Sequence, residues 1–520
     1  MWARLGARGL RRFWLVAVAV LGLQFVALLV YSAWLFHRFD LTDDFGTYTQ
    51  AWWLIGHGHA NPIDSIHSPT FPFLKNHFEI ALWPIGWLGR LWPNALLLLW
   101  LQDLALVATE FFVLLWVGRL VSERVGPRRT VVALAALLAL AASVFWYETA
   151  SFDVHGETLG LPFVVAATYF LWHERHRAAW IAAALALCFG DVVALTLLFV
   201  CIGSLASARL RRSGGTVSAF GLALVSFAWF GLVTALNANQ GSGVVPNYGY
   251  LVHAGAHATA SSVLSGLAGH PLHVLHVAAD RWPAMGRVLA SGGLLGLLTP
   301  VGFFVALGTL VPAALNVNPA FLSPTIAFQT LAVIPFVFVG SVSLLLRVGT
   351  VGTGPARPAG NHARAARRMI AGDRWRAPLA WIAAAGLIAL AVGQSVSLYS
   401  QLRSDWWRVD GPAASVLDRA LTKIPAGAEV IASQGVIGRF AERVSIYPDV
   451  AAPQAFPVRQ RTVVFVVAPA EGIESVPAAS AEADIAYARQ QLHAKVLTSG
   501  HGITVLEWQP APGTSLVVLP

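Results

Sequence analysis

Three aspartates lie within five positions near the N-terminus, at Asp40, Asp43 and Asp44. They directly follow the first long apolar run, so they stand where the chain is expected to leave a membrane. Carboxylates at a membrane surface are costly to desolvate, and they therefore indicate either a solvated loop or a functional site. In a solvated loop, Asp43 or Asp44 would cap the helix that follows. In a functional site, one of the two could act as a general base and accept a proton from a hydroxyl group.

A second group of ionisable side chains occurs at Asp153, His155 and Glu157, which alternate along the chain. In an extended segment this spacing places all three on one side, as a divalent cation requires. In a helix the three side chains would diverge, and Glu157 would only begin the next membrane span. The sequence therefore indicates no certain cofactor, assigns no metal ligand and leaves a divalent cation open.

The composition is that of a membrane protein. Of the 520 residues, 56 % are hydrophobic and 12 % are charged, whereas soluble domains carry about 25 % charged residues. The net charge of +9 comes mainly from arginines in short loops between apolar runs. This pattern is typical of cytoplasmic loops and argues against a nucleic-acid partner, so membrane lipid is the expected surrounding. The two cysteines, Cys188 and Cys201, share one apolar run and indicate no disulfide framework.

Apolar runs of about 20 residues predict the membrane spans that must position these groups. Two longer runs, 178–207 and 287–315, are interrupted by Gly190-Asp191 and by Thr299-Pro300. The placement of the arginines predicts that each is a hairpin of two short helices, with Asp191 near the outer turn of the first. Each hairpin counts as two passes, which gives about eleven passes, a cytoplasmic N-terminus and a C-terminus outside. Single spans are expected at 13–36, 95–118, 130–147, 157–173, 215–236, 325–346 and 378–399.

The predicted topology places the polar segments on the outer face. An outer loop at 37–94 contains a stretch, 77–92, whose tryptophans favour a helix lying in the headgroup layer, with a short span as the alternative. A second outer loop is expected at 237–286. The expected domains are a membrane domain, 1–400, and a small extracytoplasmic α/β domain, 401–520. In the latter, helices are predicted at Gly411–Lys423 and Ala481–His493, and strands at Glu429–Ala432, Val444–Tyr447, Thr462–Val467 and Ile503–Trp508.

Several motifs resemble those of one bacterial membrane-protein family, the domain of unknown function 2079. They are DFGTYTQAWW at 44–53, NHF at 76–78, FDVHGE at 152–157, IPAGAEVIAS at 424–433 and RVSIYP at 443–448. The motifs occur in the order in which the family has them, so the similarity extends over most of the chain.

That family resembles the C-type glycosyltransferases, multi-span enzymes that use polyprenyl-phosphate sugars and keep an acidic residue in the first outer loop. The resemblance implies a mainly α, polytopic helical bundle in the bacterial plasma membrane. It also implies transfer of a sugar from a polyprenyl-phosphate donor to a cell-envelope acceptor on the outer face. Because Asp43-Asp44 occupies the acidic place, Asp44 is the expected general base and Asp43 the alternative. One departure is Phe189-Gly190-Asp191, where the family has Lys-Glu-Asp.

A phosphate leaving group is a weak base and needs no general acid, but it does need positive charge or hydrogen-bond donors beside it. Outer-face motifs and the predicted outer loops supply the candidates. The expected substrate-binding residues are Tyr48, Gln50, His77, Asp153, His155, Glu157, Asp191 and Arg281.

Two other classes of function fit parts of the sequence. Transporters and lipid flippases also use interrupted helices at their binding sites, although the chain shows no repeated halves. A non-catalytic scaffold that binds a cell-wall partner would explain the altered motif at 189–191.

Overall fold

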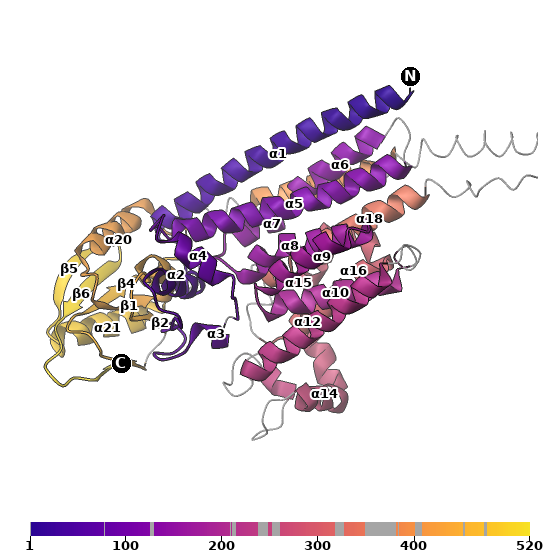
Figure 1. The fold of residues 1–520 in the computed structure, drawn as a ribbon. Coiled ribbons are helices and arrows are strands. Elements are labelled where there is room, and N and C mark those ends of the chain that lie inside the picture. Colours follow the sequence, from indigo (N-terminus) through magenta and orange to yellow (C-terminus); the bar gives the residue numbers. More distant parts are fainter. Residues whose placement is uncertain are drawn as a thin grey trace, which may run out of the picture. The chain divides into compact units, whose positions relative to one another are not determined.

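Helices make up most of the structure (Figure 1). By their contacts, the residues form two compact units, which are described separately below. The first unit comprises Met1–Ala27, Leu104–Thr149 and Gly156–Gln401, and the second comprises Leu28–Asp103, Ala150–His155 and Leu402–Pro520. The computed structural model describes residues 2–76, 78–124, 129–207, 210, 215–237, 248–251, 260–317, 327–348, 381–382, 384–400, 408–450, 453–472 and 476–520.

Within the described ranges, four helical segments are long and apolar enough to cross a membrane. They are Arg11–Arg38 in α1 (Trp2–Arg38), Leu96–Ser122 in α5 (Leu96–Arg124), Thr130–Ala150 through α6 (Arg129–Ala141) and α7 (Val144–Ala150), and Thr216–Leu236 in α12 (Thr216–Asn237). Shorter apolar helices follow at Asp191–Ala206, Pro300–Leu315, Val333–Leu346 and Ala384–Ser400. The prediction of a mainly α membrane protein is confirmed.

Both of the long apolar runs are interrupted in the structure, as predicted. Helix α9 (His176–Leu187) and helix α10 (Asp191–Ala206) meet at Gly190, whose φ of +100° is a conformation that suits glycine. The second run is broken between α15 (Pro271–Ser291) and α16 (Pro300–Leu315), where the Thr299 side chain caps α16.

The described part of the stretch 237–286 includes η2 (Gly249–Leu251), α14 (Ala260–Gly269) and most of α15, while its position on the outer face stays a prediction. Helix α14 is followed directly by the start of α15 at Pro271. Pro271 suits the start of α15, because proline at the first helical position has its φ preset for the helix. The first unit also contains α8 (Gly156–Trp172), η2 (Gly249–Leu251), η3 (Leu295–Leu298), α17 (Ala327–Thr330) and α18 (Val333–Val348).

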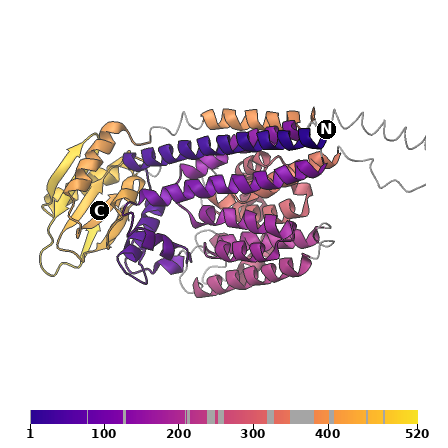
Figure 2. The same ribbon diagram turned by 45° about the horizontal axis from the view of Figure 1, so that its top comes forward.

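The helices of the first unit pack closely. Helix α10 contacts α12 and α16, and α8 contacts α9; they lie side by side in both views (Figures 1 and 2). The contact between α10 and α16 depends on Gly203, because a Cβ there would stand 2.6 Å from the Val301 Cα atom. That separation is shorter than real Cβ contacts, so the helices can approach this closely only over a glycine.

In the second unit, helix α2 (Asp43–Gly56) packs against α4 (Leu82–Leu88) and η6 (Gln434–Phe440). A short helix, α3 (Phe73–Asn76), lies between them in the chain. The stretch 77–92 was expected to form one helix; among its described residues, 78–92, only those of α4 are helical. The position of α4 in the headgroup layer stays a prediction.

The C-terminal part of the second unit contains a five-stranded mixed sheet in the order β2-β1-β4-β6-β5. Strand β1 pairs in parallel with β2 and β4, whereas β6 runs antiparallel to β4 and β5. Two further strands form a separate antiparallel pair, β3 with β7. The strands are β1 (Glu429–Ser433), β2 (Ile446–Asp449), β3 (Gln454–Pro457), β4 (Val463–Val467), β5 (Lys495–Gly500), β6 (Ile503–Trp508) and β7 (Leu516–Leu519).

The two faces of this sheet bury different cores, because successive side chains of a strand point to opposite faces. Val430 of β1 packs in the core that contains Leu417 of α20 (Gly411–Lys423). Its neighbour Ile431 packs in the core that contains Ala481 of α21 (Ala478–Gln490) (Figure 1). The α/β architecture predicted for the tail is confirmed, while the domain boundary at 400/401 stays a prediction.

Replacing Asp484 of α21 with asparagine should stabilise the protein above neutral pH. Asp484 is 3 % exposed, and burial, together with nearby Asp449, raises the pKa of its carboxyl from 3.8 to about 7. The folded state therefore holds this proton more tightly than the unfolded state, and stability falls as pH rises from about 4 to about 7. For Asp484→Asn we expect a higher melting temperature at about pH 8, on the order of 2 kcal/mol of added stability.

Thermal unfolding of the detergent-solubilised full chain measures this effect. Glu482→Gln, an exposed substitution on the same helix, is the matched control and should leave the melting temperature unchanged. If Asp484→Asn unfolds with the same pH dependence as the wild type, the burial cost assigned to Asp484 is wrong.

Candidate functional site

The candidate site is organised around the first turn of α2. Thr42 is the N-cap of this helix, with extended backbone angles and a side-chain oxygen that accepts a hydrogen bond from the Asp44 amide. The expectation that Asp43 or Asp44 would be the N-cap is therefore wrong. Both aspartates instead occupy the first helical turn, where the helix dipole favours negative charge.

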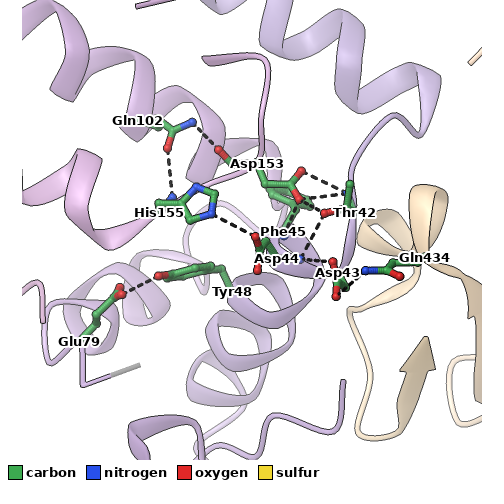
Figure 3. A network of polar contacts seen from close by, with 10 residues as sticks. All are labelled: Thr42, Asp43, Asp44, Phe45, Tyr48, Glu79, Gln102, Asp153, His155 and Gln434. Carbon is green, nitrogen blue, oxygen red and sulfur yellow. Dashed lines mark hydrogen bonds and ion pairs between the residues drawn. The ribbon is translucent and has the colours of Figure 1, made fainter. Parts of the chain in front are cut away.

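Asp153 caps the same helix from a distant part of the chain. Its Oδ2 atom accepts hydrogen bonds from the Thr42 amide at 3.1 Å and the Phe45 amide at 3.1 Å (Figure 3). The Thr42 hydroxyl donates a further hydrogen bond to the same oxygen. Because Asp153 is buried and bonded to backbone donors, its main effect is to hold the segment 42–45 in place.

Burial, together with the negative charge of Asp44, raises the pKa of Asp153 from 3.8 to about 6. Hydrogen bonds from Thr42 and Phe45 act in the opposite direction and stabilise the ionised form. The backbone of Asp153 has a φ of +30°, which non-glycine residues rarely adopt. Such strain persists only where surrounding contacts hold the conformation, and it is concentrated at functional sites.

Gln102 of α5 holds this strained segment. Its Nε2 atom donates to the Asp153 carbonyl at 2.5 Å, and its Oε1 atom accepts from the His155 amide at 3.1 Å. Sequence reasoning did not single out Gln102, because it lies inside the span predicted at 95–118. The signal was nevertheless present, since Gln102 and Asp103 are polar residues within an apolar run.

Asp44 and His155 form the pair of side chains best suited to take part in a proton transfer. His155 Nε2 lies 3.2 Å from Asp44 Oδ2; the histidine side chain is 4 % exposed and the aspartate side chain 33 %. An ionised carboxylate can only accept hydrogen bonds, so Nε2 carries the proton when Asp44 is charged. The arrangement presents a partly exposed carboxylate held by a buried imidazole.

Aromatic rings fix the orientation of that imidazole. The Phe152 ring stacks on His155 with 5.6 Å between centroids, and the Tyr48 ring meets it edge to face at 6.3 Å. Tyr48 is itself held by a hydrogen bond from its hydroxyl to Glu79 Oε1 at 2.5 Å (Figure 3). Tyr48 and Glu79 are both buried, so they position His155.

The Asp43 side chain contacts a different residue from the one that Asp44 contacts. Its Oδ2 atom accepts a hydrogen bond from Gln434 Nε2 at 3.1 Å (Figure 3). Adjacent residues of a helix project about 100° apart. The two aspartates therefore have separate surroundings, and Asp44 is the one beside His155.

A buried ion pair positions the segments on either side of the site. Arg408 Nε donates to Asp40 Oδ2 at 2.9 Å, and another of its nitrogens donates to the Ser151 carbonyl. Arg408 therefore connects Asp40, which follows α1, to the loop 150–155. Arg408 was not predicted, because only the folded chain brings it beside residues that precede it by hundreds of positions.

Gln50, expected to bind substrate, forms hydrogen bonds to two other segments of the second unit. Its amide nitrogen donates to Ser65 Oγ at 2.8 Å and to the Val444 carbonyl at 2.9 Å, and its Oε1 atom accepts from the Ser65 amide at 2.9 Å. Gln50 is fully buried. These contacts give it a structural position between α2 and the chain that leads into β2.

We expect Gln50→Ala to destabilise the protein by roughly 2 kcal/mol, because it leaves the buried Ser65 amide without its acceptor and removes the hydrogen bonds to Ser65 Oγ and the Val444 carbonyl. Thermal unfolding in detergent measures the change. Gln509→Ala, at an exposed glutamine of the same unit, is the control and should have little effect. Equal melting temperatures for the two variants would contradict the structural assignment of Gln50.

The remaining expected residues are placed as follows. Glu157 lies in the first turn of α8 and Asp191 in the first turn of α10, both in the first unit. Arg281 of α15 is 5 % exposed and donates to the Val277 carbonyl at 3.1 Å. His77 lies outside the described residues. The structure therefore brings together Asp44, Tyr48, Asp153 and His155, and it leaves the other roles as predictions.

The extended arrangement considered for Asp153, His155 and Glu157 is not present. Helix α8 begins at Gly156, so Glu157 belongs to a helix, while Asp153 and His155 point to Thr42 and Asp44. No group of three His, Cys, Asp or Glu side chains within the described ranges is placed to hold a metal ion.

The long apolar helices define the class of a polytopic membrane protein. Its carboxylate site begins four residues after the end of α1. Residues 38–462 match the model of the family described as "Predicted membrane protein (DUF2079)", and the chain belongs to that family. The matched region includes all of the site, from Thr42 to Gln434. The predicted family is thereby confirmed.

Comparisons with other proteins are more distant. No curated protein sequence matches the chain. The fold is similar to the crystal structure of ArnT from Cupriavidus metallidurans bound to undecaprenyl phosphate, with 14 % identity, a TM-score of 0.47 and coverage of 93 % of this chain and 97 % of that one. The apo structure of the same protein gives 14 % identity, a TM-score of 0.44 and the same coverage.

Proposed function

We propose that the protein is an integral-membrane glycosyltransferase that moves a sugar from a polyprenyl-phosphate donor to a hydroxyl of a cell-envelope acceptor. The observation that carries the proposal is the Asp44–His155 pair, a partly exposed carboxylate held at 3.2 Å by a buried imidazole. The motifs that resemble C-type glycosyltransferases through the family also support it, since Asp44 follows the first span as the acidic residue does there.

In this mechanism the acceptor oxygen attacks the anomeric carbon of the donor sugar. A new carbon–oxygen bond forms as the bond from the anomeric carbon to the phosphate oxygen breaks, and polyprenyl phosphate leaves with the electron pair. Asp44 accepts the hydroxyl proton, which is the work of a general base. His155 is the proposed positioning residue, because its Nε2 lies 3.2 Å from Asp44 Oδ2 and can hold the carboxylate in place.

Arg281 of the first unit is proposed, by itself, as a residue that binds a phosphate group. The guanidinium is buried, and its Nε atom has no hydrogen-bond partner among the described residues. A buried cation with an unused donor is costly unless an anion pairs with it. A phosphate oxygen is an anion that suits this group.

The proposed orientation has a cytoplasmic N-terminus, with residues 401–520 as an extracytoplasmic domain. Arginines ahead of the apolar run at 13–36 and in the short loops between apolar runs support it, because cytoplasmic loops carry an excess of arginine and lysine. The site segment that begins at Thr42 would then face the side on which polyprenyl-phosphate sugars are used by the enzymes that the family resembles.

Reconstitution tests the proposed activity. The purified full chain is placed in liposomes with labelled polyprenyl-phosphate pentose and hexose donors and a cell-envelope extract as acceptor. We expect release of polyprenyl phosphate together with a labelled acceptor. Donors that cross the bilayer unchanged would instead support a lipid flippase, and donors that neither react nor move would contradict both activities.

A further inference from the structure

We infer that a second ligand site, for carbohydrate, lies at the C-terminal end of α2. A cavity of about 410 Å³ opens there, lined by Trp52, Trp53, His57, Arg90 and Glu442 among others. Small-ligand pockets are commonly about 300–1,000 Å³, so this one has room for a sugar. All the lining residues belong to the second unit.

The walls of this cavity are fixed by close contacts. Trp52 is 2 % exposed and its indole nitrogen donates to the Ile85 carbonyl at 3.2 Å. A Cβ on Gly89 would stand 2.6 Å from the Trp52 ring, so the chain after α4 can lie against this tryptophan only because residue 89 is glycine. Arg90 Nε donates to the Gly56 carbonyl at 2.8 Å. The pocket is therefore held in shape without a ligand, which lowers the cost of binding.

The lining of the cavity combines an aromatic ring face with hydrogen-bond donors and a hydrogen-bond acceptor. Trp53 is half-buried, and the centroid of its ring lies 4.1 Å from the centroid of the His57 ring. The Arg90 guanidinium supplies donors beyond the one that it uses, and the Glu442 carboxylate supplies an acceptor. A sugar ring has carbon-bound hydrogens that pack on aromatic rings and hydroxyl groups that both donate and accept, so it satisfies all of these groups at once.

Other ligand classes fit this lining less well. A phosphate would approach the like-charged carboxylate of Glu442. A lipid tail would bury the Arg90 and Glu442 charges against hydrocarbon, which is costly. The mixture of one cation, one anion and an aromatic face therefore favours a neutral carbohydrate.

This pocket is distinct from the pair at the start of α2. Residues of a helix rise about 1.5 Å each, so Trp53 lies about 14 Å along the axis from Asp44. The inference goes beyond the proposed transfer reaction, because binding at this pocket needs neither donor lipid nor chemistry at Asp44.

Saturation-transfer NMR on the detergent-solubilised full chain tests the site. The probes are the methyl glycosides of glucose, galactose, mannose and arabinose, with no donor lipid present. We expect saturation of the ring protons of at least one glycoside by the wild type. Trp53→Ala should abolish the signal, and Glu442→Gln should weaken binding about tenfold through the loss of a charged hydrogen-bond acceptor.

Trp87→Ala is the matched control, since Trp87 is a 56 % exposed tryptophan of α4 outside the lining. It should bind like the wild type. Circular dichroism and gel filtration check each variant; if Trp53→Ala does not fold, the nearly isosteric Glu442→Gln decides.

Three results would overturn the inference: no glycoside signal from the wild type, full binding by Glu442→Gln, or displacement of the glycoside by inorganic phosphate. Because no transfer is measured, these results are separate from failure of the proposed activity.

Discussion

Replacing Asp44 with asparagine is expected to lower the rate of sugar transfer by roughly 10²–10⁴-fold, the usual contribution of a general base. Asparagine has nearly the same size and can still accept a hydrogen bond from His155 Nε2, so the pair should keep its geometry. What it loses is the ability to take the proton of the acceptor hydroxyl. The turnover number of reconstituted protein with a saturating labelled donor measures the effect.

Asp43→Asn is the matched control for that experiment. Asp43 has the same chemistry one residue earlier, but its carboxylate accepts a hydrogen bond from Gln434, whereas His155 pairs with Asp44. We expect Asp43→Asn to retain most of the turnover. If Asp43→Asn is inactive while Asp44→Asn is active, the base has been assigned to the wrong aspartate.

Removing the Asp153 side chain should have the largest effect on the stability of the site. Asp153→Ala leaves the buried amides of Thr42 and Phe45 and the Thr42 hydroxyl without their acceptor. Each unsatisfied buried donor costs about 1–3 kcal/mol, so the loss should be on the order of 3 kcal/mol. Hydrogen exchange of the amides in 42–48 should become faster, and the melting temperature should fall.

The pH dependence gives a second readout for Asp153. Its raised pKa of about 6 means that the folded state favours the protonated form. This contribution to stability is present at low pH and is lost as pH rises from about 4 to about 6, so Asp153→Ala should remove that dependence. Asp153→Asn, which keeps one acceptor oxygen, should be destabilised less than Asp153→Ala. Unchanged amide exchange in both variants would show that Asp153 does not cap α2.

Much of the helical architecture could be predicted from the sequence, because membrane spans are long local signals. The breaks in the two long apolar runs were also predictable, because Gly190 and Pro300 interrupt these runs in the sequence. In the tail, α20 and the central strands β1 and β4 were found through their hydrophobic patterns. Strands β3, β5 and β7 were missed. Strands β3 and β7 pair with each other although they are distant in the chain, and β5 is an edge strand whose partner is the neighbouring β6.

The site itself was only partly predictable. Family-like motifs pointed to Asp44 and His155, but no local pattern shows that residues 111 positions apart lie 3.2 Å from each other. The choice of Thr42 as N-cap was missed for a related reason. Thr42, Asp43 and Asp44 are all good N-cap residues, so the local sequence does not choose among them. In the structure the helix begins at Asp43, and Thr42, the N-cap, donates hydrogen bonds to the distant Asp153.

The central claim is that Asp44, held by His155, is the base of a sugar transfer from a polyprenyl-phosphate donor. The most direct test follows release of polyprenyl phosphate from a labelled donor by liposomes that contain equal amounts of wild type or Asp44→Asn. The account predicts acceptor-dependent release by the wild type and a rate lower by roughly 10²-fold or more for the variant. Equal release by the two proteins, or none by the wild type with any donor, would contradict it.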